Sequence, residues 1–317
     1  MQAMPETQQT PKPDVRDQPD VRDQSGVLYE SFFGLSSRPF LTAPDPGFLY
    51  LSEGHQLALT MLRYGILTRA PVTVVTGAVG AGKTTLIRQI LNELPGEQTV
   101  GLISNMQEGR GELLHWVLMA LDAPFDPAAG HVALFQQFQK LVVDAYAAGR
   151  RVLLIFDEAQ NLGVEALEEL RMLSNINADK DELLQIVLVG QPQLRDLLNR
   201  PELVQFAQRI SADFDLEPLR LRETAEYVRR RLKIAGAEGE VFSAEALRLI
   251  HASTGGVPRL INVLCDMALV YAYADETRLV DEQVLQDFLA SARRRGIYRQ
   301  FTQPDTAPRL VRTPVEA

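Results

Sequence analysis

The chain has 317 residues, of which 46% are hydrophobic, and a formal net charge of −9. This size allows one large domain or two smaller ones with buried cores, and the acidic balance argues against a surface built wholly for nucleic acid. The single cysteine excludes an intrachain disulfide, and the lack of a long apolar run or a leader sequence predicts a cytoplasmic protein without a membrane span.

The first 27 residues are rich in Pro, Gln and Asp, and they contain Pro-Asp-Val-Arg-Asp-Gln twice in tandem, from Pro13 and from Pro19. Because this composition leaves little to bury, we expect a disordered tail, in which the repeat is either a binding motif or a slipped duplication. Residues 28–50 reverse this character, since they hold six aromatic side chains. This aromatic arm must therefore pack on the folded part of the protein.

A helix and a phosphate-binding pattern follow the arm. Ser52 is expected to cap a helix that runs to about Arg69, with apolar residues at helical spacing on one face, namely Leu57, Met61, Leu62 and Ile66. A run of β-branched residues from Val72 predicts a strand, which breaks into Gly-Ala-Val-Gly-Ala-Gly-Lys-Thr and continues as a helix. This order of strand, loop and helix matches the pattern G-x-x-x-x-G-K-[ST].

Each residue type in the loop has a chemical reason. Glycines let backbone N–H groups turn toward phosphate oxygens, Lys83 supplies a positive charge, and the Thr84 hydroxyl can ligate Mg²⁺. The predicted nucleotide-binding residues are Gly77, Ala78, Val79, Gly80, Ala81, Gly82, Lys83, Thr84 and Thr85. The alternative is a Gly-rich turn without a ligand. Because the aromatic arm leads toward this strand, we expect it either to wall off adenine or to pack without touching a nucleotide.

Two carboxylates end the next diagnostic strand. Residues 98–104 predict a second strand, and helices follow at about 111–121 and 131–148. Five apolar residues then lead into Asp157 and Glu158, which predicts a strand buried on both faces with two acids at its ligand-binding end. We expect Asp157 to hold Mg²⁺ and Glu158 to polarise a water for attack on the γ-phosphate. A purely structural role is disfavoured, since adjacent buried carboxylates repel each other without a cation.

Two further polar residues flank later strands of the predicted sheet. Gln191 follows the strand LLQIVLVG, and its side chain either positions water beside the γ-phosphate or belongs to a loop. Arg209 precedes a last short strand, ADFDL, and either reaches the nucleotide of a neighbouring subunit or lies on the surface.

Strand signals vanish after Pro218, and helices are predicted at 222–235, 244–253, 257–273 and 281–291. Arg259 lies on the first turn of the helix that begins at Pro258, where a cation is disfavoured without an anionic partner, so a nucleotide phosphate is expected beside it. The histidines lack metal-ligand spacing and are expected to be structural. We divide the chain into a disordered tail (1–27), an α/β nucleotide-binding domain that includes the arm (28–218), a helical lid domain (219–292) and a flexible basic tail (293–317).

Seven segments between Leu28 and Ala290 resemble the AAA+ ATPases of the general secretion pathway protein A family, also called ExeA-like ATPases. They are YESFFGLSSRPF, PDPGFLYLS, GAVGAGKTTL, LLIFDEAQNL, VLVGQPQL, FAQRI and GGVPRLIN. The resemblance covers the ATPase portion and implies an α/β P-loop NTPase fold with a parallel five-stranded sheet and a helical lid. It also implies ATP and Mg²⁺ as ligands, ATP hydrolysis, and homo-oligomers with the nucleotide at subunit interfaces.

The same resemblance implies a role for individual residues. These are Walker A for Lys83 and Thr84, Walker B for Asp157 and Glu158, sensor 1 for Gln191, a finger acting in trans for Arg209, and sensor 2 for Arg259. Ala78 departs from the family, which usually has an acidic residue at this position. DEAQ also occurs in helicases, but no other segment of the chain supports that assignment.

The leading functional hypothesis is an ATP-dependent motor or switch for a secretion, pilus or exopolysaccharide export assembly of the cell envelope. Its partner would be an unidentified envelope or export protein, and the chain would be cytoplasmic or held at the inner membrane through that partner. One alternative is a DNA-binding ATPase of the transposition-regulator type. Another is a nucleotide-gated scaffold with negligible turnover.

Overall fold

The computed structural model describes residues 29–42, 46–94, 98–104, 106, 112–176, 181–294 and 301. The predicted disordered tail, its hexapeptide repeat and most of the predicted basic tail lie outside these residues. Among the residues described, no helix is both long enough and apolar enough to cross a bilayer.

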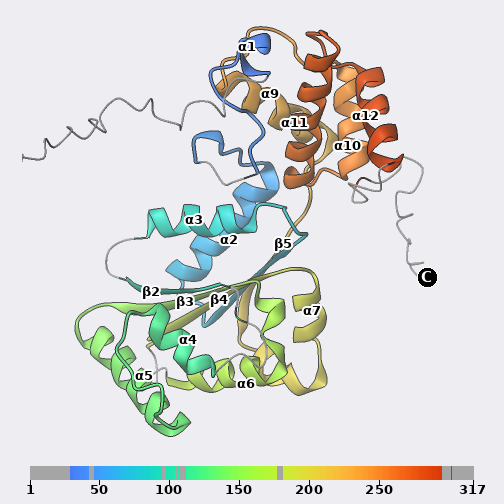
Figure 1. Cartoon of the computed structure of the whole chain (residues 1–317). Helices are drawn as coiled ribbons and strands as arrows, with labels where there is room; N and C mark the ends of the chain where they lie inside the picture. The colour runs from blue at the N-terminus through green and yellow to red at the C-terminus, as the bar shows by residue number, and fades with distance from the viewer. Residues whose placement is uncertain are drawn as a thin grey trace, which may run out of the picture.

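A five-stranded sheet forms the centre of the larger unit (Figure 1). Its strands are β1 (Val72–Gly77), β2 (Gln98–Ile103), β3 (Arg151–Asp157), β4 (Leu184–Gly190) and β5 (Ile210–Leu216). They pair in the order β2-β3-β4-β1-β5, and every pair is parallel. The central strands β1 and β4 are buried along their whole length, because helices cover both faces of the sheet. Most of their residues are apolar, and the buried polar ones are Thr73, Thr76 and Gln185. The predicted parallel five-stranded sheet is confirmed.

Helices cover the two faces of the sheet unequally (Figure 1). On one face lie α2 (Glu53–Leu67) and α3 (Lys83–Glu93), and on the other lie α4 (Leu113–Ala120), α5 (His131–Ala147), α6 (Gly163–Leu173), α7 (Gln193–Leu198) and α8 (Val204–Ala207). Short 3₁₀ turns connect them: η4 (Ala159–Asn161), η5 (Ser174–Ile176) and η6 (Pro201–Leu203). Alternate strand residues enter different cores, so Ile155 packs with α2 and α3 whereas Leu154 packs with α4 to α8.

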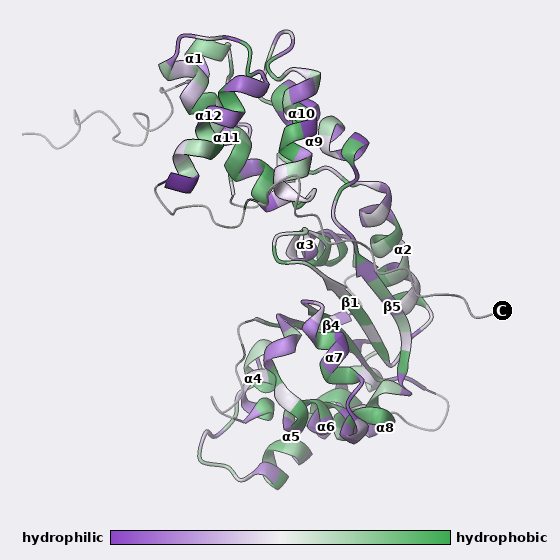
Figure 2. Ribbon diagram, turned by 90° about the vertical axis from the view of Figure 1, so that its right-hand side faces the viewer, coloured by the Kyte–Doolittle hydropathy of each residue, from purple (hydrophilic) through white to green (hydrophobic). Residues whose placement is uncertain are grey.

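A second, all-helical unit follows β5 and forms a separate lobe, seen from the side in Figure 2. It contains α9 (Leu221–Ile234), α10 (Ala244–Thr254), α11 (Pro258–Ala274) and α12 (Glu282–Arg294). Its core is apolar and includes Val228, Ile250, Leu264 and Phe288. The predicted helical lid is thus present, and its one cysteine, Cys265, is a fully buried core residue.

The aromatic arm belongs to the core of the helical unit. It contains α1 (Glu30–Phe33) and the 3₁₀ turn η3 (Pro46–Phe48). Tyr29, Phe40 and Phe48 are buried with residues of α9 to α12, and the rings of Phe40 and Phe242 meet edge to face at 6.1 Å. Our sequence division placed the arm with the sheet domain, whereas its rings are buried against the helices. The remaining domain boundaries stay predictions.

Gly256 holds the connection between the two units. Its carbonyl accepts a hydrogen bond from the N–H of Leu219 at 2.9 Å, its φ is +75°, and an added Cβ would lie 1.9 Å from the Leu219 carbonyl oxygen. We expect Gly256→Ala to lower the free energy of unfolding in urea by roughly 3 kcal/mol, since it combines left-handed strain with a backbone clash.

The neighbouring Gly255 supplies the control. It also has a positive φ, +59°, but an added Cβ there would meet no described atom within 4 Å. Gly255→Ala should therefore cost only about 1 kcal/mol. If the two variants lose the same free energy of unfolding, the clash with Leu219 does not contribute to the effect.

Candidate nucleotide site

The loop between β1 and α3 has no room for side chains at two positions. Gly80 and Gly82 have φ values of +79° and +105°. An added Cβ would lie 2.5 Å from the Arg259 Cβ at Gly80 and 2.7 Å from the His55 Nε2 at Gly82. The loop therefore passes between α2 and α11 as nearly bare backbone, as a phosphate cradle requires.

Lys83 turns back onto this loop. Its Nζ donates to the carbonyl oxygens of Gly77 at 2.9 Å and of Ala78 at 3.0 Å, and the residue is only 5% exposed. Burial lowers the pKa of Lys83, while the nearby carboxylates of Glu158, Asp157 and Asp215 act in the opposite direction. A buried cation with two neutral acceptors is well placed to bind an anion.

Thr84 and Asp157 meet at the same edge of the sheet. Thr84 lies on the first turn of α3 and Asp157 ends β3, and the Thr84 Oγ1 donates to the Asp157 Oδ2 at 3.2 Å. Burial raises the pKa of Asp157, although the hydrogen bonds from Thr84 and from the N–H of Glu158 partly offset it. A hydroxyl and a carboxylate are oxygen ligands that suit Mg²⁺, which usually keeps waters and phosphate oxygens as its other ligands. Among the described residues, no three Asp, Glu, His or Cys side chains lie close enough to hold a metal ion by themselves. A Mg²⁺ ion with two protein ligands and further ligands from water and phosphate agrees with that arrangement.

Glu158 is held by two amide side chains. Its Oε2 accepts from the Gln160 Nε2 at 2.7 Å and from the Gln191 Nε2 at 3.0 Å, and the N–H of Gln191 donates to the Gln160 Oε1 at 2.9 Å. Burial pushes the pKa of Glu158 upward, but these donors and the charge of Lys83 together leave it lowered. Glu158 is thus kept ionised at the end of β3, with φ at +58°.

Two residues of the site were not predicted as such. Gln160 links Glu158 to Gln191, and its only sequence signal is its place two residues after the acid. His55 supports the loop, since its Nε2 lies 2.9 Å from the Ala81 carbonyl oxygen and its Nδ1 lies 2.7 Å from the Ser52 Oγ. A carbonyl can only accept, so the proton is on Nε2, and burial lowers the pKa of His55. Its predicted structural role therefore acts on the phosphate loop itself.

The two predicted arginines lie in different places. The backbone N–H of Arg259 donates to the Gly80 carbonyl at 3.3 Å, and its exposed guanidinium has no ion pair among the residues described. Arg209 donates instead to the Ser174 Oγ at 2.9 Å and to the side chain of Asn175.

Arg209 is separated from the loop of its own chain by the length of a strand. Ile210 pairs with Val72, at the start of β1, whereas the loop follows Gly77. At a rise of about 3.3 Å per residue these ends are roughly 17 Å apart. The structure thus brings six of the predicted site residues together, namely Lys83, Thr84, Asp157, Glu158, Gln191 and Arg259. Arg209 lies instead at the opposite end of the strands, where β1 and β5 begin.

A cavity of about 530 Å³ extends from the loop to the helical unit. Loop and α3 residues line one end, and the other end is lined by Leu41, Phe48 and Tyr50 of the arm with Tyr227 and Asn262 of the helices. Its size and its mixture of apolar walls with a few polar groups are typical of small-molecule sites.

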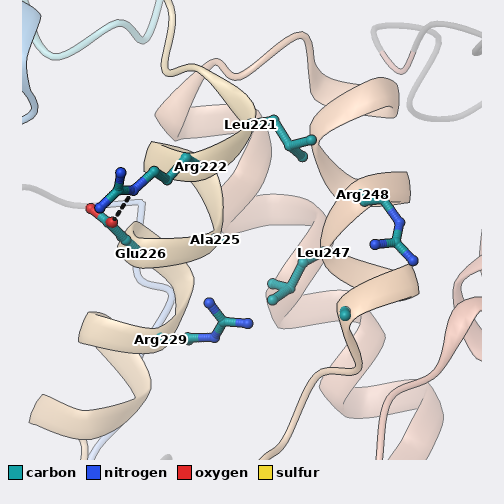
Figure 3. Close-up of a pocket in the computed structure, with 8 residues that line it drawn as sticks. Leu221, Arg222, Ala225, Glu226, Arg229, Leu247 and Arg248 are labelled. Carbon is teal, nitrogen blue, oxygen red and sulfur yellow. Dashed lines mark hydrogen bonds and ion pairs between the residues drawn. The ribbon is translucent and has the colours of Figure 1, made fainter.

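A second cavity of about 400 Å³ lies between α9 and α10 (Figure 3). Leu221 of α9 and Leu247 of α10 both line it, and Arg222 pairs with Glu226 at 3.0 Å. It shares no lining residue with the first cavity and has no glycine loop. The phosphate-loop cavity is therefore the candidate nucleotide site.

Comparison with known proteins gives matches in sequence and in fold. The AAA domain family matches residues 66–198. General secretion pathway protein A of Aeromonas hydrophila is 42% identical over 247 residues, which are 78% of this chain, and the chain spans 45% of that protein's length.

Two solved structures share the fold at lower identity. The Aeropyrum pernix ORC2 protein superposes with a TM-score of 0.57 and 20% identity, over 80% of this chain and 71% of that chain. Drosophila ORC bound to DNA superposes with a TM-score of 0.61 and 18% identity, over 91% of this chain and 73% of that chain. At these identities the two structures show similarity of fold alone.

Proposed function

Because the chain belongs to the AAA+ P-loop NTPases and is related to general secretion pathway protein A over its ATPase portion, we propose that it binds ATP with Mg²⁺ and hydrolyses it. The observation that carries this proposal is that Lys83, Thr84 and Glu158 line one nucleotide-sized cavity, where Thr84 also donates a hydrogen bond to Asp157. The direct test is release of phosphate from ATP, which should require Mg²⁺ and stop when EDTA removes it.

Each residue of the site has a proposed task. The backbone from Gly77 to Thr85 would surround the phosphates, and Lys83 would exchange its two carbonyl partners for phosphate oxygens. Thr84 and Asp157 would hold Mg²⁺, which supplies charge neutralisation when bound. Glu158 would accept the proton of the attacking water, oriented with the help of Gln191, and Arg259 would reach a phosphate from the lid.

The position of Arg209 supports an assembly of several copies. Since it lies a strand's length from its own loop, we propose that it completes the site of a neighbouring chain in a homo-oligomer. Binding or cleavage of the nucleotide would then change how neighbouring copies touch.

For the cellular role, we propose a motor or switch for an assembly of the cell envelope, in the cytoplasm or at the inner membrane through partners. Its support is the 42% identity to a protein named for the general secretion pathway. Cross-linking the Glu158→Gln protein to its cellular partners in the presence of ATP tests this role. Recovery of export components would support it, whereas steeply salt-dependent binding to duplex DNA would favour the transposition-type alternative.

Gln160 gives a prediction specific to the water-activating group. Gln160→Leu removes a donor to Glu158 and the acceptor of the Gln191 N–H. We expect hydrolysis to slow by on the order of tenfold or more. ATP affinity should stay within about twofold, because Gln160 is not among the residues that line the phosphate-loop cavity. Single-turnover rates with a parallel binding titration measure both. Loss of affinity in step with rate would assign Gln160 to folding of the site instead.

A further inference from the structure

Arg231 is a buried cation at the junction of arm, lid and cavity. It lies on α9 and is 7% exposed, and it lines the phosphate-loop cavity at the end away from the loop. Its guanidinium lies 4.9 Å from the ring centre of Phe48 and 5.4 Å from that of Tyr227. Burial of an arginine without an ion pair is costly, and no ion pair to Arg231 exists within the described part of the chain.

The hydrogen bonds of Arg231 lead to the arm. Its Nε donates to the carbonyl of Pro39, and one terminal nitrogen donates to the Tyr227 hydroxyl at 2.9 Å. The other terminal nitrogen is buried without a hydrogen-bond partner among the described atoms. Charge-assisted bonds of this kind are stronger than neutral ones, so Arg231 ties α9 firmly to the arm.

Tyr227 and Asn262 extend this connection to a second arm carbonyl. The Tyr227 hydroxyl donates to the Asn262 Oδ1 at 2.8 Å, and the Asn262 Nδ2 donates to the Leu41 carbonyl at 3.1 Å. We call Arg231, Tyr227 and Asn262 the arm latch. Its members fix the arm backbone at residues 39 and 41, and Leu41 itself lines the cavity.

The cavity has two chemically different ends. The loop end carries Lys83 and Thr84 and suits phosphates, whereas the arm end is walled by Leu41, Phe48 and Tyr50 and suits an aromatic base. Tyr50 itself stands edge to face with Tyr227 at 5.7 Å. The latch therefore fixes the wall of the end where the base of a bound nucleotide would lie.

We propose that Arg231, through Tyr227 and Asn262, is a positioning residue that holds the arm as the base-binding wall and so sets the base-dependent part of ATP affinity. This inference rests on the proposed function, since it concerns the same nucleotide. It assigns the latch no contact with the phosphates.

The experiment compares ATP with inorganic tripolyphosphate, both with Mg²⁺, by calorimetry on the full chain. Arg231→Met should weaken ATP at least about tenfold, the effect of losing hydrogen bonds from a charged group, and leave tripolyphosphate affinity unchanged. Tyr227→Phe removes only the hydroxyl that joins Arg231 to Asn262, and it should weaken ATP several-fold in the same selective way even if Arg231→Met fails to fold.

Arg229→Met is the matched control, because Arg229 lies on the same helix as Arg231 but lines the second cavity, between α9 and α10 (Figure 3). It should leave both affinities unchanged. The inference is overturned if the latch variants weaken ATP and tripolyphosphate equally, if neither affinity changes, or if the unchanged protein binds ATP no tighter than tripolyphosphate. Absence of binding of either ligand by the unchanged protein would instead contradict the proposed function, and this inference with it.

Discussion

Replacement of Lys83 by alanine is expected to weaken ATP binding by at least about a hundredfold, equivalent to about 3 kcal/mol. Lys83 is the cation that the loop itself encloses, with its Nζ between the Gly77 and Ala78 carbonyls. Its charge would therefore act on the phosphates from within the loop, away from bulk water. Fluorescence titration with a labelled ATP analogue in the presence of Mg²⁺ measures the loss.

Glu158→Gln is the matched variant for this experiment. Glutamine keeps an oxygen that can accept from Gln160 and Gln191 but cannot take a proton from water. ATP should bind as tightly as in the unchanged protein, while phosphate release should fall to background. Equal ATP affinity in Lys83→Ala and the unchanged protein would refute the assignment of the phosphate loop.

Removal of Arg209 should slow hydrolysis by on the order of a thousandfold, as loss of an arginine finger does in related phosphoryl-transfer enzymes. Its guanidinium is held by Ser174 and Asn175 at the edge of the sheet opposite its own loop. ATP affinity should change far less than the rate, because the finger acts mainly on transition-state charge. Phosphate release under saturating ATP measures this effect, and Arg200→Ala, an exposed arginine on the same connection, is the control.

A mixing experiment tests whether Arg209 acts in trans. Arg209→Ala and Glu158→Gln proteins, each nearly inactive alone, are combined at several ratios. A shared interface would pair an intact Arg209 of one chain with an intact Glu158 of its neighbour, so part of the turnover should return. If no ratio restores turnover, Arg209 has only its local contacts with η5.

The sheet and the phosphate loop could be predicted because their signals are local. The runs that became β1, β3 and β4 consist mainly of apolar and β-branched residues, as burial on both faces favours. The positions of Lys83, Asp157 and Gln191 at the carboxyl ends of β1, β3 and β4 follow from parallel pairing alone. Sequence could therefore place most of the candidate site before any distance was known.

Contacts between distant segments could not be predicted in this way. The apolar face of α2 includes Ala58 and Leu59, and Leu57, expected on that face, is 53% exposed. The orientation of α2 depends on His55, which must reach the Ala81 carbonyl across 26 positions of sequence. Likewise, the burial of the arm rings depends on α9 to α12, about two hundred residues away, and no periodicity within the arm indicates which unit it joins.

The central claim is that the loop from Gly77 to Thr84, with Asp157, holds a magnesium-bound triphosphate. Titration calorimetry of ATP with Mg²⁺ into the Glu158→Gln protein tests it most directly, since turnover cannot then distort the heat. We expect the Glu158→Gln protein to bind one ATP per chain in a saturable way. This binding should disappear in the double variant that also carries Lys83→Ala. A folded Glu158→Gln protein that gives no heat with ATP and Mg²⁺ at any concentration would contradict the claim.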